Sequence, residues 1–222
     1  MKKLLIVAVI FAAAFVSCKS SKNIKSFSEK DSLAYAWGLD YGTHAKMVDS
    51  TMNANIIAQA IIDVMKGKNS MTIDQANDFR NEYYTLRLPV RQKAEAQEYL
   101  DDVKAKNPNI KVTDSGLMYE IIDEGDMSVK ATDSADEVLV NYKGTLKDGT
   151  VFDQNDSLKF ALNRVIKGWT EGMKLVGKGG EIILWVPSDL GYGERGSGQI
   201  PANSALKFEV TLLDVIPVAP AE

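Results

Sequence analysis

The sequence contains very few of the side chains that carry out nucleophilic, acid–base or metal chemistry. Among its 222 residues there is one cysteine, Cys18, and one histidine, His44. A single cysteine excludes an intramolecular disulfide. His44 falls on a predicted helix, far from the strand-rich part of the chain, and we interpret it as an ordinary surface or packing residue. The sequence offers neither a catalytic triad nor a cluster of metal ligands, so we predict a protein without a metal or a cofactor.

An excess of positive charge is also absent. Lysine and arginine number 26 against 30 aspartate and glutamate, which gives a formal net charge of −4. Because there is no basic patch, we do not expect nucleic acid as a partner. The composition, with 45% hydrophobic and 25% charged residues, is that of a globular protein of one or two domains.

Only one long apolar run is present, over residues 4–16, and its 13 residues are too few to span a bilayer comfortably. Lys2 and Lys3 precede this run and form the basic start that is typical of a secretory signal peptide. We therefore predict a signal peptide over residues 1–17.

The apolar run ends at Phe15-Val16-Ser17-Cys18, which resembles the lipobox of bacterial lipoproteins, with Phe15 in place of the usual leucine. The resemblance implies cleavage before Cys18 and diacylation of its thiol. Several acyl chains anchor a protein stably where one does not. Residues 18–28 would then form a lipidated, polar tether. The alternative is an ordinary secretory signal with an incidental cysteine.

Residues 29–110 are predicted to form a helical domain. Apolar side chains at helical spacing predict helices over residues 31–47 and 53–66. A capping box beginning at Thr72 starts a third segment that continues to Lys106, and Pro89 predicts a kink or a break within it. The first two helices have little nearby to cover their apolar stripes. They either pack as a small bundle on the rest of the chain or intertwine with a second subunit, and the composition favours neither.

Residues 111–222 have a pattern of strands. Alternating apolar positions predict strands over residues 117–122, 137–146, 181–186 and 205–216, and Asp148-Gly149 is a hairpin signal before Val151-Phe152. One short helix, from Trp169 to Val176 and closed by Gly177, lies between them. The predicted fold class is α+β, with a helical domain followed by an antiparallel sheet wrapped on one short helix.

The glycine-rich stretch Gly191 to Gly198 (GYGERGSG) contains the G-x-G-x-x-G pattern of dinucleotide-binding loops. Such a loop must open a helix, because the helix N-terminus supplies the N–H groups for the phosphates. Here residues 199–203 (QIPAN) and another predicted strand follow instead. We therefore do not expect nucleotide binding, and predict a long, tightly turned loop with Tyr192 at its base.

A series of short motifs in the second half of the chain resembles the FK506-binding-protein (FKBP) family of peptidyl-prolyl isomerases. In chain order these are VNYKGTL (140–146), DG (148–149), FD (152–153), VIKGW (165–169), GM (172–173), VP (186–187), LGYG (190–193), IPAN (200–203), Leu206 and Phe208. Each motif is weak alone, but together they cover about residues 117–216 and are specific. The resemblance implies an FKBP-type isomerase domain over residues 111–222.

Nine positions resemble the proline-binding pocket of that family. The resemblance implies a catalytic group of Asp153, Tyr192, Phe208 and Trp169, and a substrate-binding group of Tyr142, Phe152, Val165, Ile166 and Ile200. Trp169 would form the floor, and the Ile166 N–H and the Tyr192 hydroxyl would donate to substrate carbonyls. Each apolar member alone could be an ordinary core residue. The combination with Asp153 and Tyr192 is what a plain core does not need.

Some positions depart from the family pattern. Asn141 stands where histidine is common, Gln154 where serine is common and Ala202 where a second proline is common. The stretch 155–159 is short, and Leu158 falls where another aromatic side chain often lines the site. We expect these departures to change affinity or substrate preference without removing the site.

The resemblance implies a peptidyl-prolyl cis-trans isomerase, or rotamase, that assists the folding of exported proteins. Its partners would be proline-containing unfolded or nascent exported polypeptides, with FK506-type macrolides as inhibitors. The helical region is similar in pattern to envelope relatives that resemble macrophage infectivity potentiator, which implies a homodimer in the bacterial cell envelope, lipid-anchored and facing the periplasm. The alternative is a periplasmic holdase chaperone with weak or incidental isomerase activity.

Overall fold

The computed structural model describes residues 27–218, so the predicted signal peptide and Cys18 lie outside the described residues. The chain divides into two compact units between Thr72 and Ile73. Within the described part of the chain, no helix combines the length and the apolar character that a membrane crossing requires.

The first unit holds two helices, α1 (Glu29–Val48) and α2 (Ala54–Met65), close to the two predicted ones. The Ser28 and Asn53 side chains cap them by accepting backbone N–H groups of the first turn. Neither helix has a buried residue. The predicted apolar stripe of α1 is open to solvent in the single chain, with Trp37 56% exposed.

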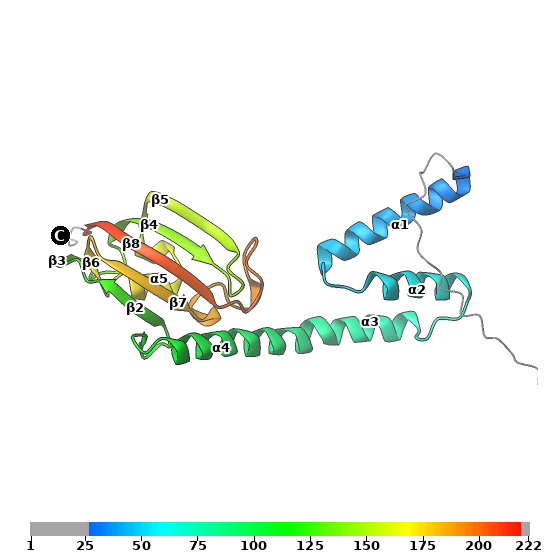
Figure 1. The fold of residues 1–222 in the computed structure, drawn as a ribbon, viewed down its shortest axis with the longest axis horizontal. Coiled ribbons are helices and arrows are strands. Elements are labelled where there is room, and N and C mark those ends of the chain that lie inside the picture. Colours follow the sequence, from blue (N-terminus) through cyan, green and yellow to red (C-terminus); the bar gives the residue numbers. More distant parts are fainter. Residues whose placement is uncertain (1–26, 219–222) are drawn as a thin grey trace, which may run out of the picture. The chain divides into compact units, whose positions relative to one another are not determined.

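The second unit begins with one long helical segment. It consists of α3 (Ile73–Glu82), a π-helical turn (Tyr83–Arg87) and α4 (Leu88–Lys106), which follow one another in Figure 1. Of the kink or break predicted at Pro89, the break does not occur, and the irregularity is the π-helical turn. Proline lacks the N–H and clashes with the carbonyl four residues earlier, but here Leu88 N–H bonds to the Tyr83 carbonyl, five residues back. The wider turn just before the proline makes room for it.

A six-stranded antiparallel sheet follows, with strand order β1-β2-β7-β8-β4-β5. Its strands are β1 (Lys111–Val112), β2 (Met118–Asp123), β4 (Glu137–Thr145), β5 (Val151–Ala161), β7 (Glu181–Val186) and β8 (Leu206–Ile216). The four predicted strands are confirmed within two residues at each end. The predicted hairpin is also confirmed, because Leu146 N–H bonds to the Thr150 carbonyl and Gly149 has a φ of +83°.

Helix α5 (Lys167–Gly172) packs on one face of this sheet (Figure 1). Two glycines allow the close approach, since a Cβ at Gly168 or Gly172 would lie 2.6 Å from a side chain of β7. The predicted extension of the helix to Val176 is wrong. Gly177 instead begins β6 (Gly177–Lys178), which pairs with β3 (Asp126–Lys130) in a second, two-stranded sheet that the sequence did not reveal. A Cβ at Gly177 would lie 2.0 Å from the Asp126 carbonyl oxygen, so this pairing requires glycine.

The main core lies between α5 and the inner face of the sheet. Its fully buried side chains include Leu117, Val138, Leu162, Met173, Leu184 and Leu206. A second cluster lies on the outer face, where Ala96 and Leu100 of α4 pack with Met118, Trp185 and Ala205. The last turns of the long helix therefore pack as part of the sheet domain.

A buried carboxylate fastens the C-terminal end of this unit. Asp136 is 3% exposed, and its side chain accepts the backbone N–H groups of Thr132, Asp133 and Val218 at 2.8, 2.9 and 2.9 Å. Burial would raise the pKa of Asp136, but these three hydrogen bonds, with a smaller contribution from Lys174, lower it below the ordinary value of 3.8.

Candidate active site

A pocket of about 250 Å³ opens between β5, the start of α5 and the connection from β7 to β8. Its lining is mainly aromatic and aliphatic: Tyr142, Phe152, Asp153, Leu158, Phe160, Arg164, Val165, Ile166, Trp169, Tyr192 and Phe208. Strands β4, β5 and β8, helix α5, the segment before α5 and the loop after β7 all contribute to it, so the pocket exists only in the folded domain.

Trp169 forms the centre of the pocket wall and is 4% exposed. Three rings meet it edge to face or at a steep angle: Tyr142 at 5.1 Å, Phe160 at 5.2 Å and Phe208 at 5.2 Å between centroids. Each such ring pair contributes about 0.5–1.5 kcal/mol beyond the burial of its area. The cluster holds Trp169 in one orientation at the pocket floor.

Phe152 reaches the pocket because a glycine faces it from the next strand. A Cβ on Gly144 of β4 would lie 2.6 Å from the Phe152 ring and 3.0 Å from the Phe208 ring. Phe152 and Phe208 meet edge to face at 5.5 Å between centroids. In this part of β4, Tyr142 forms one aromatic wall of the pocket, and Gly144 leaves the space that the Phe152 ring occupies.

The polar groups gather at the rim of the pocket. The Tyr142 hydroxyl donates to the Asp153 carboxylate at 2.6 Å, and the Asn155 side-chain amide donates to the same hydroxyl oxygen at 3.3 Å. Partial burial, followed by the hydrogen bond to Asp153, raises the pKa of Tyr142 to about 12. The tyrosine therefore stays protonated at neutral pH and keeps Asp153 oriented.

Two further donors at the pocket have no hydrogen-bond partner among residues 27–218. They are the Ile166 backbone N–H, just before α5, and the Tyr192 hydroxyl. Burial, and secondly the negative charge of Asp153, raise the pKa of Tyr192, so this hydroxyl also remains a donor at neutral pH. Both groups are available to a carbonyl oxygen that enters the pocket.

The structure brings together eight of the nine predicted pocket residues and leaves one out. Ile200 does not line the pocket; it is 7% exposed and belongs to the hydrophobic core. Sequence reasoning missed Phe160 and Arg164, and treated Leu158 only as a departure. Strand β5 was predicted only at its start, although the alternation of Leu158 and Phe160 along it was the available signal.

Two of the departures from the family pattern prove to be connected. Asn141 accepts the Ser157 backbone N–H at 2.8 Å, and Ser157 has a φ of +54° where the pairing of β4 with β5 shifts its register. The asparagine side chain therefore fixes the irregular turn of the short β5 segment. That turn places Asn155 beside the Tyr142 hydroxyl.

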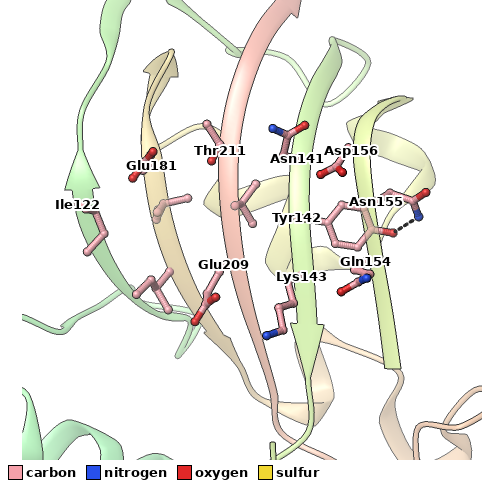
Figure 2. Close-up of a pocket in the computed structure, with 13 residues that line it drawn as sticks. Ile122, Asn141, Tyr142, Lys143, Gln154, Asn155, Asp156, Glu181, Glu209 and Thr211 are labelled. Carbon is pink, nitrogen blue, oxygen red and sulfur yellow. Dashed lines mark hydrogen bonds between the residues drawn. The ribbon is translucent and has the colours of Figure 1, made fainter. Parts of the chain in front are cut away.

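A larger hollow, of about 720 Å³, lies on the opposite face of the sheet (Figure 2). On β8, Phe208 and Leu212 point into the core, so Glu209 and Thr211, which line this hollow, point to the other side. Figure 2 shows mostly polar and charged side chains there. Its greater size does not make it the better candidate, because its lining is mostly polar, whereas the smaller pocket combines an apolar wall with convergent polar groups.

The glycine-rich stretch forms the loop that the sequence predicted. Residues 187–203 contain two short 3-10 turns, Ser188–Leu190 and Gly193–Arg195, and lead directly into β8. Gly193, Gly196 and Gly198 have φ values of +59°, +65° and +54°. These glycines serve the turns of the loop, and the strand–loop–helix arrangement of a dinucleotide site is not formed.

Comparison with known proteins identifies the family. The model of the FKBP-type peptidyl-prolyl cis-trans isomerase domain matches residues 129–213, and the model of the domain amino-terminal to it matches residues 30–121. A probable FKBP-type peptidyl-prolyl cis-trans isomerase of Haemophilus influenzae is 36% identical over 95% of this chain and 95% of its own length. The outer membrane protein MIP of Legionella longbeachae is 33% identical over 97% of this chain and 98% of its own.

A solved structure agrees with these sequence matches. The crystal structure of FkpA from Escherichia coli superposes with a TM-score of 0.60 at 30% identity, covering 86% of this chain and 99% of that one. Both parts of the chain, the helical region and the antiparallel sheet domain, thus correspond to known relatives. The chain belongs to the family of FKBP-type peptidyl-prolyl cis-trans isomerases, and it is an isomerase of this type.

Proposed function

We propose that the 250 Å³ pocket around Trp169 is where this isomerase binds and twists X–Pro bonds. Rotation about such a bond is slow because amide resonance sets a barrier of ~18–20 kcal/mol. The enzyme has to bind the twisted bond better than either planar form. That task needs no nucleophile or metal.

The apolar lining supports this role for the pocket. A proline ring enclosed by Trp169, Phe208 and Phe152 leaves its imide carbonyl in a water-poor place. The twisted imide has less charge separation along O–C–N than the planar one, so it loses less on leaving water. The aromatic cluster therefore favours the twisted state.

The polar rim would orient the chain around that bond. The unpartnered Ile166 N–H and Tyr192 hydroxyl are the donors we assign to substrate carbonyls on either side of the proline. Asp153, held by Tyr142 at 2.6 Å, places one negative charge beside the reacting imide. This charge stabilises the altered dipole of the twisted bond without accepting or releasing a proton.

The observation that carries the proposal is the coincidence of the Trp169 aromatic cluster with the Tyr142–Asp153 pair in one pocket. The test is NMR exchange on a proline peptide, using the soluble fragment Lys19–Glu222 with and without an FK506-type macrolide. We expect fast exchange that the macrolide suppresses. Tyr142→Phe should slow it roughly tenfold, because a hydrogen bond to a charged group contributes about 1.5–3 kcal/mol.

Tyr119→Phe is the matched control, because Tyr119 lies on β2 and does not line the pocket. Its exchange rate should equal that of the unmodified fragment. A folded fragment that does not accelerate exchange, or a Tyr142→Phe variant as fast as Tyr119→Phe, would remove the pocket assignment.

We further propose that the enzyme acts on exported polypeptides in the bacterial cell envelope, held to a membrane by lipid on Cys18. The signal-like segment of residues 1–17 and the lipobox-like ending support this, and one full-length relative is named as an outer membrane protein. Mass spectrometry of the mature N-terminal peptide tests it. A diacylglyceryl group on Cys18 is expected, and an unmodified or absent Cys18 would contradict it.

We also propose a homodimer formed through α1 and α2. The support is that both helices carry large exposed apolar side chains and have no buried residue in the single chain. Exposed side chains such as Trp37, Ile56 and Ile61 would be covered by the same helices of a second copy. Sedimentation analysis of the soluble fragment tests the dimer, and a monomer at micromolar concentration would exclude it.

A further inference from the structure

The loop that carries Tyr192 is held at its two ends, whereas the Tyr192–Glu194 segment between them is exposed or half-buried. Its first turn is closed by the Leu190 and Gly191 N–H groups, which bond to the Pro187 and Ser188 carbonyls at 3.0 and 2.9 Å. Its C-terminal end is held by the bridge between Ser197 and Ile200, by the Asn203 N–H bond to the Gly193 carbonyl at 2.8 Å, and by burial of Ile200 and Asn203. Tyr192 itself is 39% exposed. A contact from outside the loop, close to Tyr192, would therefore add to what positions its hydroxyl.

That outside support comes from α4. Lys93 Nζ lies 2.7 Å from the Glu194 carboxylate, in a hydrogen-bonded ion pair that spans 101 positions of sequence. The hydrogen bond and the charge of Glu194 raise the pKa of Lys93, and the negative charge of Asp189 adds to this. Asp189 precedes Tyr192 in the chain and Glu194 follows it. Lys93 therefore attracts negative charges on both sides of Tyr192.

Lys93 projects from a firmly docked part of the helix. Ala96 and Leu100, one and two turns further on, are buried against Trp185 and Ala205 of the sheet domain. A second ion pair, from Glu95 of α4 to Lys147 of the β4–β5 turn, lies at 2.5 Å. Lys93 therefore lies on a helix that is packed on the sheet domain, whereas Glu194 belongs to the exposed part of the Tyr192 loop.

We propose that Lys93 is a positioning residue for isomerisation, and that α4 holds the Tyr192 hydroxyl at the pocket through the Lys93–Glu194 ion pair. The inference rests on the proposed role of Tyr192 as a donor to substrate. An exposed ion pair of this kind shifts an equilibrium by up to about fivefold. That bias is enough to change how much of the enzyme has its loop in the binding position.

The prediction concerns KM more than kcat. A donor that holds the substrate chain stabilises the planar and the twisted forms alike, so its loss raises KM and leaves kcat nearly unchanged. In the soluble fragment Lys19–Glu222 with a proline peptide, Lys93→Met and Glu194→Gln should each raise KM roughly two- to fivefold, and Lys93→Arg should restore most of it. Raising salt from 50 mM to 1 M should raise KM of the unmodified fragment by a similar factor, because exposed pairs are screened.

Two controls separate this role from a structural one. Glu95→Gln removes the neighbouring α4 ion pair, which reaches the β4–β5 turn and not the Tyr192 loop, and should leave KM unchanged. In a Tyr192→Phe background, Lys93→Met should not raise KM further, because Lys93 is proposed to act only through the Tyr192 hydroxyl.

The outcomes distinguish this inference from the proposed function. If Tyr192→Phe raises KM while Lys93→Met does not, or if Glu95→Gln has the same effect as Lys93→Met, the positioning role is overturned. An effect of Lys93→Met that persists in the Tyr192→Phe background overturns it as well. If Tyr192→Phe leaves KM unchanged in an active enzyme, the donor role of Tyr192 fails first and the inference fails with it.

Discussion

The two units of the chain keep their apolar side chains in opposite places. In α1 and α2 no residue is buried, while the sheet domain buries its aliphatic and aromatic groups so fully that Leu117, Leu184 and Leu206 are 0% exposed. The sheet domain is therefore stabilised by its own packing. The first two helices carry apolar surface that only another surface can cover. The difference supports the two proposals made above, catalysis in the sheet domain and association through α1 and α2.

The largest expected effect is a loss of core packing in the sheet domain. Leu184→Ala should lower the free energy of unfolding by about 2–5 kcal/mol, because it removes a fully buried side chain on β7 where α5 packs. The midpoint of urea unfolding of the sheet domain, followed by tryptophan fluorescence, measures this loss. Ile61→Ala on α2 is the comparison, and should cost less than about 0.5 kcal/mol in that transition. Equal costs would contradict the contrast between the units.

The next effect concerns Asp136, the carboxylate that fastens the end of the sheet domain. Asp136→Asn places an amide N–H₂ against backbone donors, and should cost roughly 1.5–3 kcal/mol at pH 7. The folded pKa of Asp136 is lowered, so its stabilisation is present above the ordinary value of 3.8 and is lost as the pH falls through the folded pKa. The gap between the two proteins should therefore close below about pH 4.

Urea unfolding from pH 7 to pH 3 measures that gap. If the difference in free energy of unfolding stays constant with pH, the side chain of Asp136 stabilises the fold by its packing and not by its negative charge. A difference that widens in acid would contradict the direction of the pKa shift.

A substitution in α1 is expected to change the stability of the single chain least. Its effect is expected on the assembly of two chains instead. Trp37→Glu puts a charge among the exposed apolar side chains of α1 and should convert the proposed dimer to a monomer in sedimentation. Turnover of a short proline peptide should change less than about twofold, since the pocket is far from this change in sequence and belongs to the other unit. The matched control is Lys46→Glu, which should remain dimeric. Lys46 lies nine residues after Trp37 on α1, about 180° around the helix axis.

Much of this architecture could be predicted because local signals were strong. The apolar spacing in residues 54–65, the alternation in residues 137–145 and the Asp148-Gly149 turn each lead to one structure. Eight pocket positions could be predicted because they stand within motifs whose order and spacing are specific. The aromatic geometry around Trp169 follows from those positions.

The remaining features depend on contacts between distant segments. The π-helical turn that accommodates Pro89 has no local marker. Gly177 is typical of a helix end, but it begins β6 and pairs with Lys130 of β3 instead. Ile200 stands at a sequence position that matches the family's pocket, but its side chain is buried in the hydrophobic core. The Lys93–Glu194 pair joins residues 101 positions apart, a distance over which single-sequence patterns carry no information.

The most direct test of the account is to locate a bound proline peptide on the folded enzyme. Methyl-labelled Lys19–Glu222 distinguishes the two hollows, since Val165 and Ile166 line the 250 Å³ pocket whereas Ile122 and Ile183 line the 720 Å³ hollow on the opposite face. We predict that the peptide shifts the methyl signals of Val165 and Ile166, together with the Trp169 indole N–H, and leaves those of Ile122 and Ile183 in place. Shifts confined to Ile122 and Ile183 would place the substrate on the wrong face and contradict the account.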